Sequence, residues 1–331
     1  MDELTLFHTI WCSTRLSDCT RNIMSLALNA TRTECFIKPH ILSLDGGGNI
    51  ILTVNIVANI LLVLTAILGN CSILLSFVFV SSLRSTSNYL LFGLAVTDLG
   101  VGFVVHPLYI FVLFRVYNNS TPHCNVMAAY SVATSLLGGV SLLYITVIGI
   151  DRHLAIKLHL RYRVLVTEKR TNIAQIAVWV INGLLSLVWL KGFRIYSGFA
   201  AVMIIFSLLA SFYVYIKMYW VVKRHTGQIH FQMGSQMLHL EFCRLKRLRK
   251  SAVNTMYVFF VFLLCYLPFC TSTMITNIST SPNKAGILSF ELSATIMLSN
   301  SSLNPLMYCL RFREFRIAVK KTYRILFCLN E

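Results

Sequence analysis

Seven long apolar segments are the feature that most limits the fold of this chain. A helix needs about 20 mostly apolar residues to cross the roughly 30 Å of hydrocarbon in a membrane. Seven stretches of the 331 residues approach or exceed that length, and most charged residues fall between them. The sequence therefore predicts an all-α membrane protein, a seven-transmembrane helix bundle. The predicted spans are Ile51–Val80, Tyr89–Phe114, Val126–Ile150, Ile173–Leu190, Phe199–Val222, Val253–Ile275 and Ile287–Leu310.

The composition argues against several other classes of protein. Hydrophobic residues make up 56% of the chain and charged residues only 12%, whereas a soluble domain carries about 25% charged residues. The net charge of +17 lies on no basic patch of a soluble domain, so we expect no nucleic-acid partner. A transporter or channel, the alternative function, would show several buried charges or a repeated half. An enzyme would need catalytic groups gathered at one membrane depth, and the sequence shows no such set.

The charge distribution predicts how the chain is oriented in the membrane. Of the 29 Lys and Arg residues, 21 lie in alternate connections and in the C-terminal segment. Because such residues stay on the cytoplasmic side, we expect a cytoplasmic C-terminus and an extracellular N-terminus in the plasma membrane. Outside the predicted spans, glycosylation acceptors of the N-x-S/T type all fall on the predicted extracellular side. They are Asn29, Asn118, Asn119 and Asn277.

Three segments follow from this orientation. Residues 1–49 form an extracellular tail, residues 50–310 form the bundle, and residues 311–331 form the cytoplasmic C-terminus. The last segment has the basic, amphipathic pattern of a short eighth helix that lies on the inner leaflet, with membrane lipids as partners. Cys328 near its end is a candidate for palmitoylation, and an ordinary buried thiol is the alternative.

Six of the spans carry short motifs in a fixed order. In that order the chain resembles the rhodopsin-like (class A) G-protein-coupled receptors from about Ile50 to Cys328. The resemblance implies a cell-surface receptor that binds an extracellular ligand and activates a heterotrimeric G protein. The motifs are Gly69-Asn70, LAVTDL with Asp98, IDRH with Asp151-Arg152, Trp179, CYLP with Pro268, and NPLMY from Asn304 to Tyr308.

The resemblance also implies which residues switch the receptor on. Arg152 resembles the arginine that swings toward the G protein, and Pro268 resembles the proline that kinks the sixth span. Tyr266 stands where the family usually has tryptophan. Because the motif residues are intact, a pseudoreceptor that binds without signalling is disfavoured. The implied switch positions are Asp151, Arg152, Tyr213, Tyr266, Pro268, Asn304, Pro305 and Tyr308.

Two features of the sequence bear on the resting state of the receptor. One is an expected sodium site, and the other is the lack of an acid in the sixth span. A lone carboxylate in a low dielectric needs a cation or a proton, and related receptors hold sodium at such a carboxylate. No other cofactor is expected. Many family members also restrain the arginine with an acid in the sixth span, where this chain has Leu248, so we expect ligand-independent signalling. The implied sodium ligands are Asp98, Ser141, Asn300, Ser301 and Asn304.

The predicted ligand pocket is neutral and mildly polar. Amine receptors use an aspartate in the third span, but no acid occurs between Cys124 and Ile150. Retinal receptors need a lysine in the seventh span, and Ile287–Leu310 has none. The sequence therefore argues against an amine or retinal as ligand. The candidate pocket residues, each of which could instead pack between helices, are Tyr109, Thr134, Ser135, Cys270, Thr273 and Glu291.

The extracellular cysteines depart from the family pattern. The loop between the fourth and fifth spans contains no cysteine, so the usual disulfide to that loop cannot form. Cys124 could pair instead with Cys12, Cys19 or Cys35, or remain a free thiol. The absent loop cysteine, the short loop and a fifth span without proline resemble the melanocortin branch and its wider cluster, which contains adenosine, cannabinoid and lysolipid receptors.

Overall fold

The structure, a computed structural model, describes residues 46–120, 122–158, 161–188, 193–229, 236–278 and 284–328. The chain divides into two compact units, residues 1–39 and residues 40–331, and every described residue belongs to the second. In this described part all regular structure is helical, with no strand. The all-α class expected from the apolar segments is therefore confirmed.

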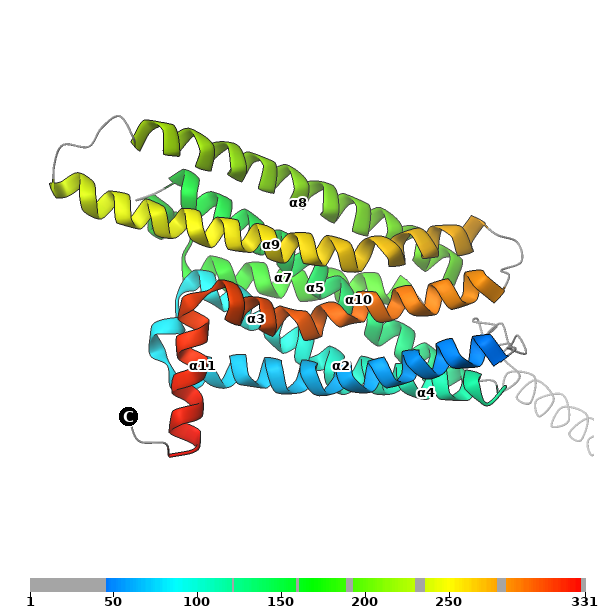
Figure 1. The fold of residues 1–331 in the computed structure, drawn as a ribbon. Helices are drawn as coiled ribbons and strands as arrows, with labels where there is room; N and C mark the ends of the chain where they lie inside the picture. Colours follow the sequence, from blue (N-terminus) through cyan, green and yellow to red (C-terminus); the bar gives the residue numbers. More distant parts are fainter. Residues whose placement is uncertain are drawn as a thin grey trace, which may run out of the picture. The chain divides into compact units, whose positions relative to one another are not determined.

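The seven predicted spans all correspond to helices in Figure 1. Most helices are longer than the span predicted for them, because polar residues at their ends continue the helical backbone. The second span is continuous but is built from an α-helix, a π-helical turn and another α-helix. The helices are α2 (Gly46–Phe79), α3 (Thr86–Gly100), η2 (Val101–Val105), α4 (His106–Tyr117), α5 (Cys124–Leu158), α7 (Glu168–Leu187), α8 (Phe193–Ile229), α9 (Gln236–Ile278) and α10 (Lys284–Arg311).

Length and composition alone qualify five helices of the described chain as membrane spans. They are Gly48–Phe79, Thr86–Tyr117, Cys124–Leu158, Ile195–Val221 and Val253–Thr276. The other two expected spans, α7 and α10, are present as helices but are less apolar. The first turn of α7 is charged, and α10 carries Glu291 and a run of serine and asparagine residues. These polar residues of α10 face neighbouring helices, as the sites below show.

The packing places α5 at the centre of the bundle. It contacts α3, η2, α4, α7, α8 and α9, whereas α10 packs between α9 and α2 and also contacts α3. Large buried side chains such as Tyr144, Phe262 and Tyr308 fill the core. Large apolar side chains on the outer faces are exposed, among them Leu64, Leu184 and Phe206. This is the arrangement expected of a bundle surrounded by lipid, because lipid favours apolar side chains on the outside.

Three shorter helices connect or follow the spans: η1 (Ser81–Leu83), α6 (Tyr162–Leu165) and α11 (Arg313–Leu326). Figure 1 shows that α11, in red, turns away from α10 and crosses the end of α2. Phe315 and Ala318 of α11 are buried, and Tyr323 Oη of the same helix lies 2.6 Å from Ser72 Oγ of α2. The predicted amphipathic eighth helix is therefore present and is fixed to α2 by one face.

Candidate functional site

Asp98 is the central polar residue of the inner half of the bundle. Its side chain is fully buried on α3. Asn304 Nδ2 of α10 donates to one carboxylate oxygen at 2.7 Å, and Ser141 Oγ of α5 donates to the other at 3.3 Å. Ser301 supplies a further side-chain hydrogen bond. The carboxylate therefore joins three helices at one point.

Asn300 lies one helical turn before Asn304 and tests the sodium expectation. Its side chain is 2% exposed, and neither its amide nitrogen nor its amide oxygen has a hydrogen-bond partner among the described residues. A buried amide without partners is costly unless something else binds it. The Asp98 carboxylate, the Ser141 and Ser301 hydroxyls and the Asn300 carbonyl are all hard oxygen donors. This donor set fits a small cation such as sodium.

The NPLMY segment packs tightly against α2. A Cβ atom added at Gly69 would lie 2.9 Å from the ring of Pro305, so glycine is needed for this close approach. The neighbouring Asn70 donates from Nδ2 to the carbonyl of Ser301 at 3.0 Å. Tyr308 is fully buried, and its ring lies 5.8 Å from that of Phe315 in α11. The motif therefore connects α2, α10 and α11.

Tyr266 occupies the base of the expected ligand pocket. Its hydroxyl donates to the carbonyl of Gly138 in α5 at 3.0 Å, and its ring stacks on Phe262 at 4.1 Å. Pro268 lies inside α9, two residues further along. The tyrosine that replaces the family's tryptophan thus gains a polar anchor on the central helix.

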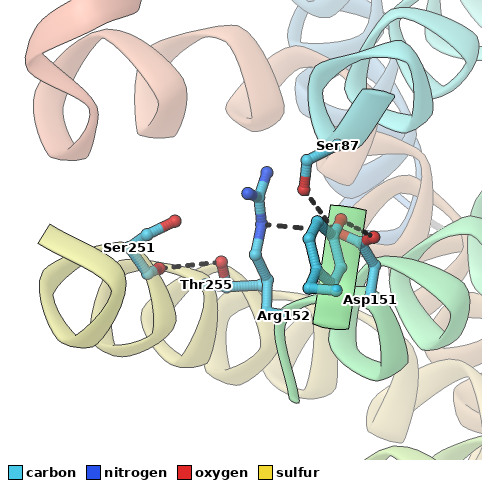
Figure 2. Close-up of polar contacts among 6 residues, drawn as sticks. Ser87, Asp151, Arg152, Ser251 and Thr255 are labelled. Carbon is cyan, nitrogen blue, oxygen red and sulfur yellow. Dashed lines mark hydrogen bonds and ion pairs between the residues drawn. The ribbon is translucent and has the colours of Figure 1, made fainter. Parts of the chain in front are cut away.

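Asp151 gathers polar groups at the inner end of α5 (Figure 2). Ser87 of α3 donates to its carboxylate, and Tyr162 of α6 donates at 2.6 Å. Arg152 Nε lies 4.0 Å from the same carboxylate, which is too long for a hydrogen bond. Burial and the nearby carboxylate raise the pKa of Tyr162 above its usual value, so the phenol remains a donor. Asp151 therefore binds two hydroxyl groups more closely than it binds Arg152.

The structure assigns the inward-facing tyrosine of α8 to Tyr215, not to Tyr213. The Tyr213 side chain is 62% exposed and lies near Lys217 on the outer face, with the Lys217 nitrogen 5.5 Å from its ring centroid. Tyr215 is 3% exposed, stacks on Phe259 at 4.6 Å and interacts with the charge of Arg152. Two residues rotate a helix by more than half a turn, so only one of the two can face the core.

Tyr109 and Glu291 meet near the outer ends of α4 and α10. Tyr109 Oη lies 2.7 Å from the backbone oxygen of Glu291 and 2.8 Å from its carboxylate. The Tyr109 ring is stacked on Tyr130 of α5, with 5.1 Å between the ring centroids. Thr134, the expected third-span pocket position, follows Tyr130 by one helical turn and is half-buried.

Two of the remaining candidate pocket residues, Ser135 and Thr273, bond carbonyls of their own helices, and Ser135 also forms a side-chain hydrogen bond with Tyr196 of α8. Ser135 donates to the carbonyl of Ser131 at 2.6 Å, and Thr273 donates to the carbonyl of Phe269 at 2.8 Å. Cys270 is a half-buried free thiol. The structure thus brings Tyr109 and Glu291 into direct contact and adds Tyr130, which the sequence analysis did not select.

Comparison with known proteins agrees with these arrangements. A family described as "7 transmembrane receptor (rhodopsin family)" matches residues 69–197. The alpha-1A adrenergic receptor of Bos taurus is 27% identical over 80% of this chain and 66% of its own length. The histamine H2 receptor of Cavia porcellus is 26% identical over 81% of this chain and 78% of its own length. The adenosine receptor A2b of Gallus gallus is 24% identical over 86% of this chain and 92% of its own length.

The match over residues 69–197 and these receptor relatives support a rhodopsin-like G-protein-coupled receptor. Its relatives are receptors, not enzymes, and they give no support to a transporter or channel. The chain spans about two thirds of the length of the adrenergic relative. Because the relatives include adrenergic, histamine and adenosine receptors, they do not single out the cluster suggested by the absent loop cysteine.

A second polar cluster of the receptor was missed by the sequence analysis. Asn59 Nδ2 of α2 lies 2.9 Å from Thr295 Oγ1 of α10, which in turn donates to Asn55 Oδ1 at 2.5 Å. His106 Nδ1 lies 3.0 Å from Asn59 Oδ1. Asn55 and Asn59 are four residues apart, so they lie on one face of an otherwise apolar helix. That spacing was the available signal that α2 meets polar partners here.

The expected modification sites are only partly described. Asn118 and Asn119 are exposed in the turn after α4, whereas Asn277 lies in the last turn of α9. Cys328 is a free, exposed cysteine just after α11. Cys124, at the start of α5, is disulfide-bonded. Asn29, Cys12, Cys19 and Cys35 lie outside the described residues, so the choice of disulfide partner stays a prediction.

Proposed function

We propose that the receptor lies in the plasma membrane with residues 1–49 outside and residues 311–331 inside, and that an extracellular ligand makes it activate a heterotrimeric G protein. The distribution of Lys and Arg supports this orientation. The ligand would enter at the end of the bundle where α4 ends and α5 begins. The G protein would bind at the opposite end, where Asp151 and Arg152 lie in the last two turns of α5.

The observation that carries this proposal is the weak restraint on Arg152. Its side chain is 12% exposed, and its Nε lacks a hydrogen-bond partner in the described part of the chain. Asp151, the neighbouring acid, is occupied by Ser87 and Tyr162. A guanidinium held this loosely can turn toward a partner without first breaking a close ion pair. The position of Arg152 in the last two turns of the central helix supports an inner-face binding site for that partner.

Sodium would stabilise the resting state of this receptor. The Asp98 carboxylate, with Ser141, Ser301 and Asn300, would hold the ion and leave Asn304 less firmly bonded to Asp98 than it is here. Because Asn304 belongs to NPLMY, movement of α10 would change the site. Agonist affinity that sodium lowers in wild type but not in Asp98→Asn would support this. Equal sodium sensitivity of both proteins would contradict it.

Signalling can be tested before the ligand is known. We expect full-length receptor at the cell surface to raise G-protein activation above that of untransfected cells, because no acid is available at Leu248 to restrain Arg152. Arg152→Ala should abolish this basal signal. Arg170→Ala is a matched control, since Arg170 is an exposed basic residue that bonds only a loop carbonyl in the described chain. A basal signal that survives Arg152→Ala at matched surface levels would refute the proposal.

Lipid attachment, glycosylation and topology can be tested with the same cells. We propose palmitoylation at Cys328, next to the exposed apolar residues Leu326 and Phe327 of the α11 end. We also propose glycans at Asn29, Asn118 and Asn119. Replacing these three asparagines with glutamine should remove most of the mass that glycosidase removes from wild type. A tag at Glu331 that antibodies stained on intact cells would overturn the orientation.

A further inference from the structure

The outer half of α5 is packed less closely than its inner half. Every residue from 131 to 139 is only half-buried, whereas nearly all residues from 140 to 149 are buried. Other helices surround α5, including α4 and η2 near its outer half. Nine consecutive positions cover every side of a helix, so the neighbours of α5 leave room around its outer half, and we call this room the gap. This gap lies at the end of α5 where Tyr130 is found.

Glu291 is an under-satisfied acid at this gap. Its carboxylate can accept several hydrogen bonds, but Tyr109 is its one recorded donor in the described chain, and that hydroxyl has a single proton. Tyr109 shares this proton between the Glu291 backbone oxygen at 2.7 Å and the carboxylate at 2.8 Å. Within the part of the chain that the structure describes, no basic side chain forms an ion pair with Glu291. The acid therefore retains capacity for another partner.

Two stacked tyrosines add a surface suited to a cation. The Tyr109 and Tyr130 rings are nearly parallel, at 10°, and Tyr130 lies close enough to Glu291 for the two to interact electrostatically. The face of an aromatic ring attracts a positively charged group, most strongly where water is excluded. Tyr130 is half-buried, so part of its ring borders the gap. A carboxylate beside aromatic rings is complementary to a charged nitrogen.

We propose that the corner formed by Glu291, Tyr109 and Tyr130 binds a positively charged nitrogen of the ligand, an ammonium or a guanidinium group, with Glu291 as its counter-ion. The inference rests on the proposed function, because it specifies the ligand of the same outer site. An ionised carboxylate inside a membrane protein needs a cation, and this one has none of its own. Amine receptors carry their acid on the third span, where this chain has none, whereas here the acid is on α10.

The test uses a cation as the probe. Thr134→Cys places a thiol one helical turn from Tyr130, in full-length receptor on intact cells. Two methanethiosulfonates of similar size are compared, one with a trimethylammonium group and one with a sulfonate. Rates are corrected for their reaction with a free thiol and for labelling of the receptor without the added cysteine. An ionised Glu291 should make the corrected rate of the cationic reagent about tenfold higher than that of the anionic one.

Charge variants decide whether Glu291 causes the preference. Glu291→Gln should reduce the rate ratio to near one, and Glu291→Asp, which keeps the charge, should preserve most of it. Asn118→Cys, in the exposed turn after α4, is a control whose rate ratio should not depend on Glu291. Ser135→Cys replaces Thr134→Cys if the latter does not reach the cell surface.

Two results would overturn the proposal. An unchanged rate ratio in Glu291→Gln would show that Glu291 is protonated or lies too far from the introduced thiol to act on the reagent. Glu291 would then not serve as the counter-ion of a charged ligand. Failure of both introduced cysteines to react would show that the gap is closed to small cations. Neither measurement involves a G protein. The proposed cation site can therefore be contradicted while basal signalling through Arg152 is confirmed, and basal signalling can be contradicted while the cation site is confirmed.

Discussion

Asp98 and Glu291 are both acids within the membrane-spanning bundle, but their surroundings differ. Asp98 is fully buried, and Asn304 and Ser141 from two other helices bond its two oxygens. Glu291 is half-buried and shares one tyrosine proton with its own backbone. The inner acid is thus part of a connected network, whereas the outer acid is open to a partner from outside.

This difference divides the receptor into two regions along its length. In the inner half, hydrogen bonds and close packing connect α2, α3, α5 and α10 around Asp98 and Asn70. In the outer half, the central helix is partly exposed, Ser135 and Thr273 bond carbonyls of their own helices, and the cluster around Asn59 connects α2, α4 and α10 away from α5. A connected inner half can pass a movement between helices, because its parts cannot shift independently. An open outer half can admit a ligand.

The largest expected effect is on stability. Asp98→Ala would leave Asn304 and Ser141 without their buried acceptor, at a cost of about 1–3 kcal/mol. Glu291→Ala removes one shared hydrogen bond, which in membrane proteins contributes about 0.6 kcal/mol on average. Thermal unfolding of the purified receptor should therefore show a clearly lower Tm for Asp98→Ala than for Glu291→Ala. Equal losses would mean that the two acids are held alike, and the comparison would fail.

The second effect separates two tyrosines of α8. Tyr215→Phe removes a buried hydroxyl near Arg152, whereas Tyr213→Phe alters a side chain on the outer face. The Tyr215 hydroxyl has no hydrogen-bond partner in the described chain, although it interacts with the charge of Arg152. We expect Tyr215→Phe to change basal G-protein activation by about three- to tenfold, the size of effect expected if this hydroxyl bonds the Arg152 guanidinium once that side chain moves. Tyr213→Phe should remain within about twofold of wild type. A larger effect at Tyr213 would show that the inward face of α8 has been assigned incorrectly.

A third prediction restores the acid that the inner end of α9 lacks. The Leu248 side chain lies outside the described ones, but its position in the sequence is the one used in other family members. Leu248→Glu should lower basal signalling, by at most about fivefold, because an ion pair near the surface contributes about 0–1 kcal/mol. Leu248→Gln is the matched uncharged control and should change little. No difference between these variants would indicate that apolar packing already closes the inner end.

The smallest effect is expected at Tyr162. Tyr162→Phe frees Oδ1 of Asp151, whereas Oδ2 of the same carboxylate accepts from Ser87 and lies 4.0 Å from Arg152 Nε. The carboxylate can then turn its free oxygen toward Arg152. Basal signalling should fall by about two- to threefold, which corresponds to less than 1 kcal/mol. Surface expression should be unaffected, since Tyr162 lies on a short helix outside the spans. A rise in basal signalling would show instead that Tyr162 itself restrains Arg152.

The sequence was sufficient to predict the membrane spans and the positions of the motifs along them. Apolar length predicts helices because a membrane leaves backbone groups no other partners, and the two less apolar spans were still long enough to recognise. Asp98, Asn304 and Ser141 were grouped correctly from the resemblance to rhodopsin-like receptors. Tyr213 was selected incorrectly as the inward-facing tyrosine of α8. This helix lacks the proline that would fix the position of the tyrosine relative to the family pattern.

The amino-acid sequence by itself determined that this chain crosses the membrane as a bundle of helices and belongs with the rhodopsin-like receptors, because burial of apolar length and ordered motifs are local properties. Only the tertiary structure decided which polar groups meet. Tyr109 with Glu291, Tyr162 with Asp151, and Asn59 with Thr295 are contacts between helices or between a helix and a connection. Such pairs depend on the rotation and depth of each helix. Many side chains packed together set these two variables, and no single motif in the sequence does.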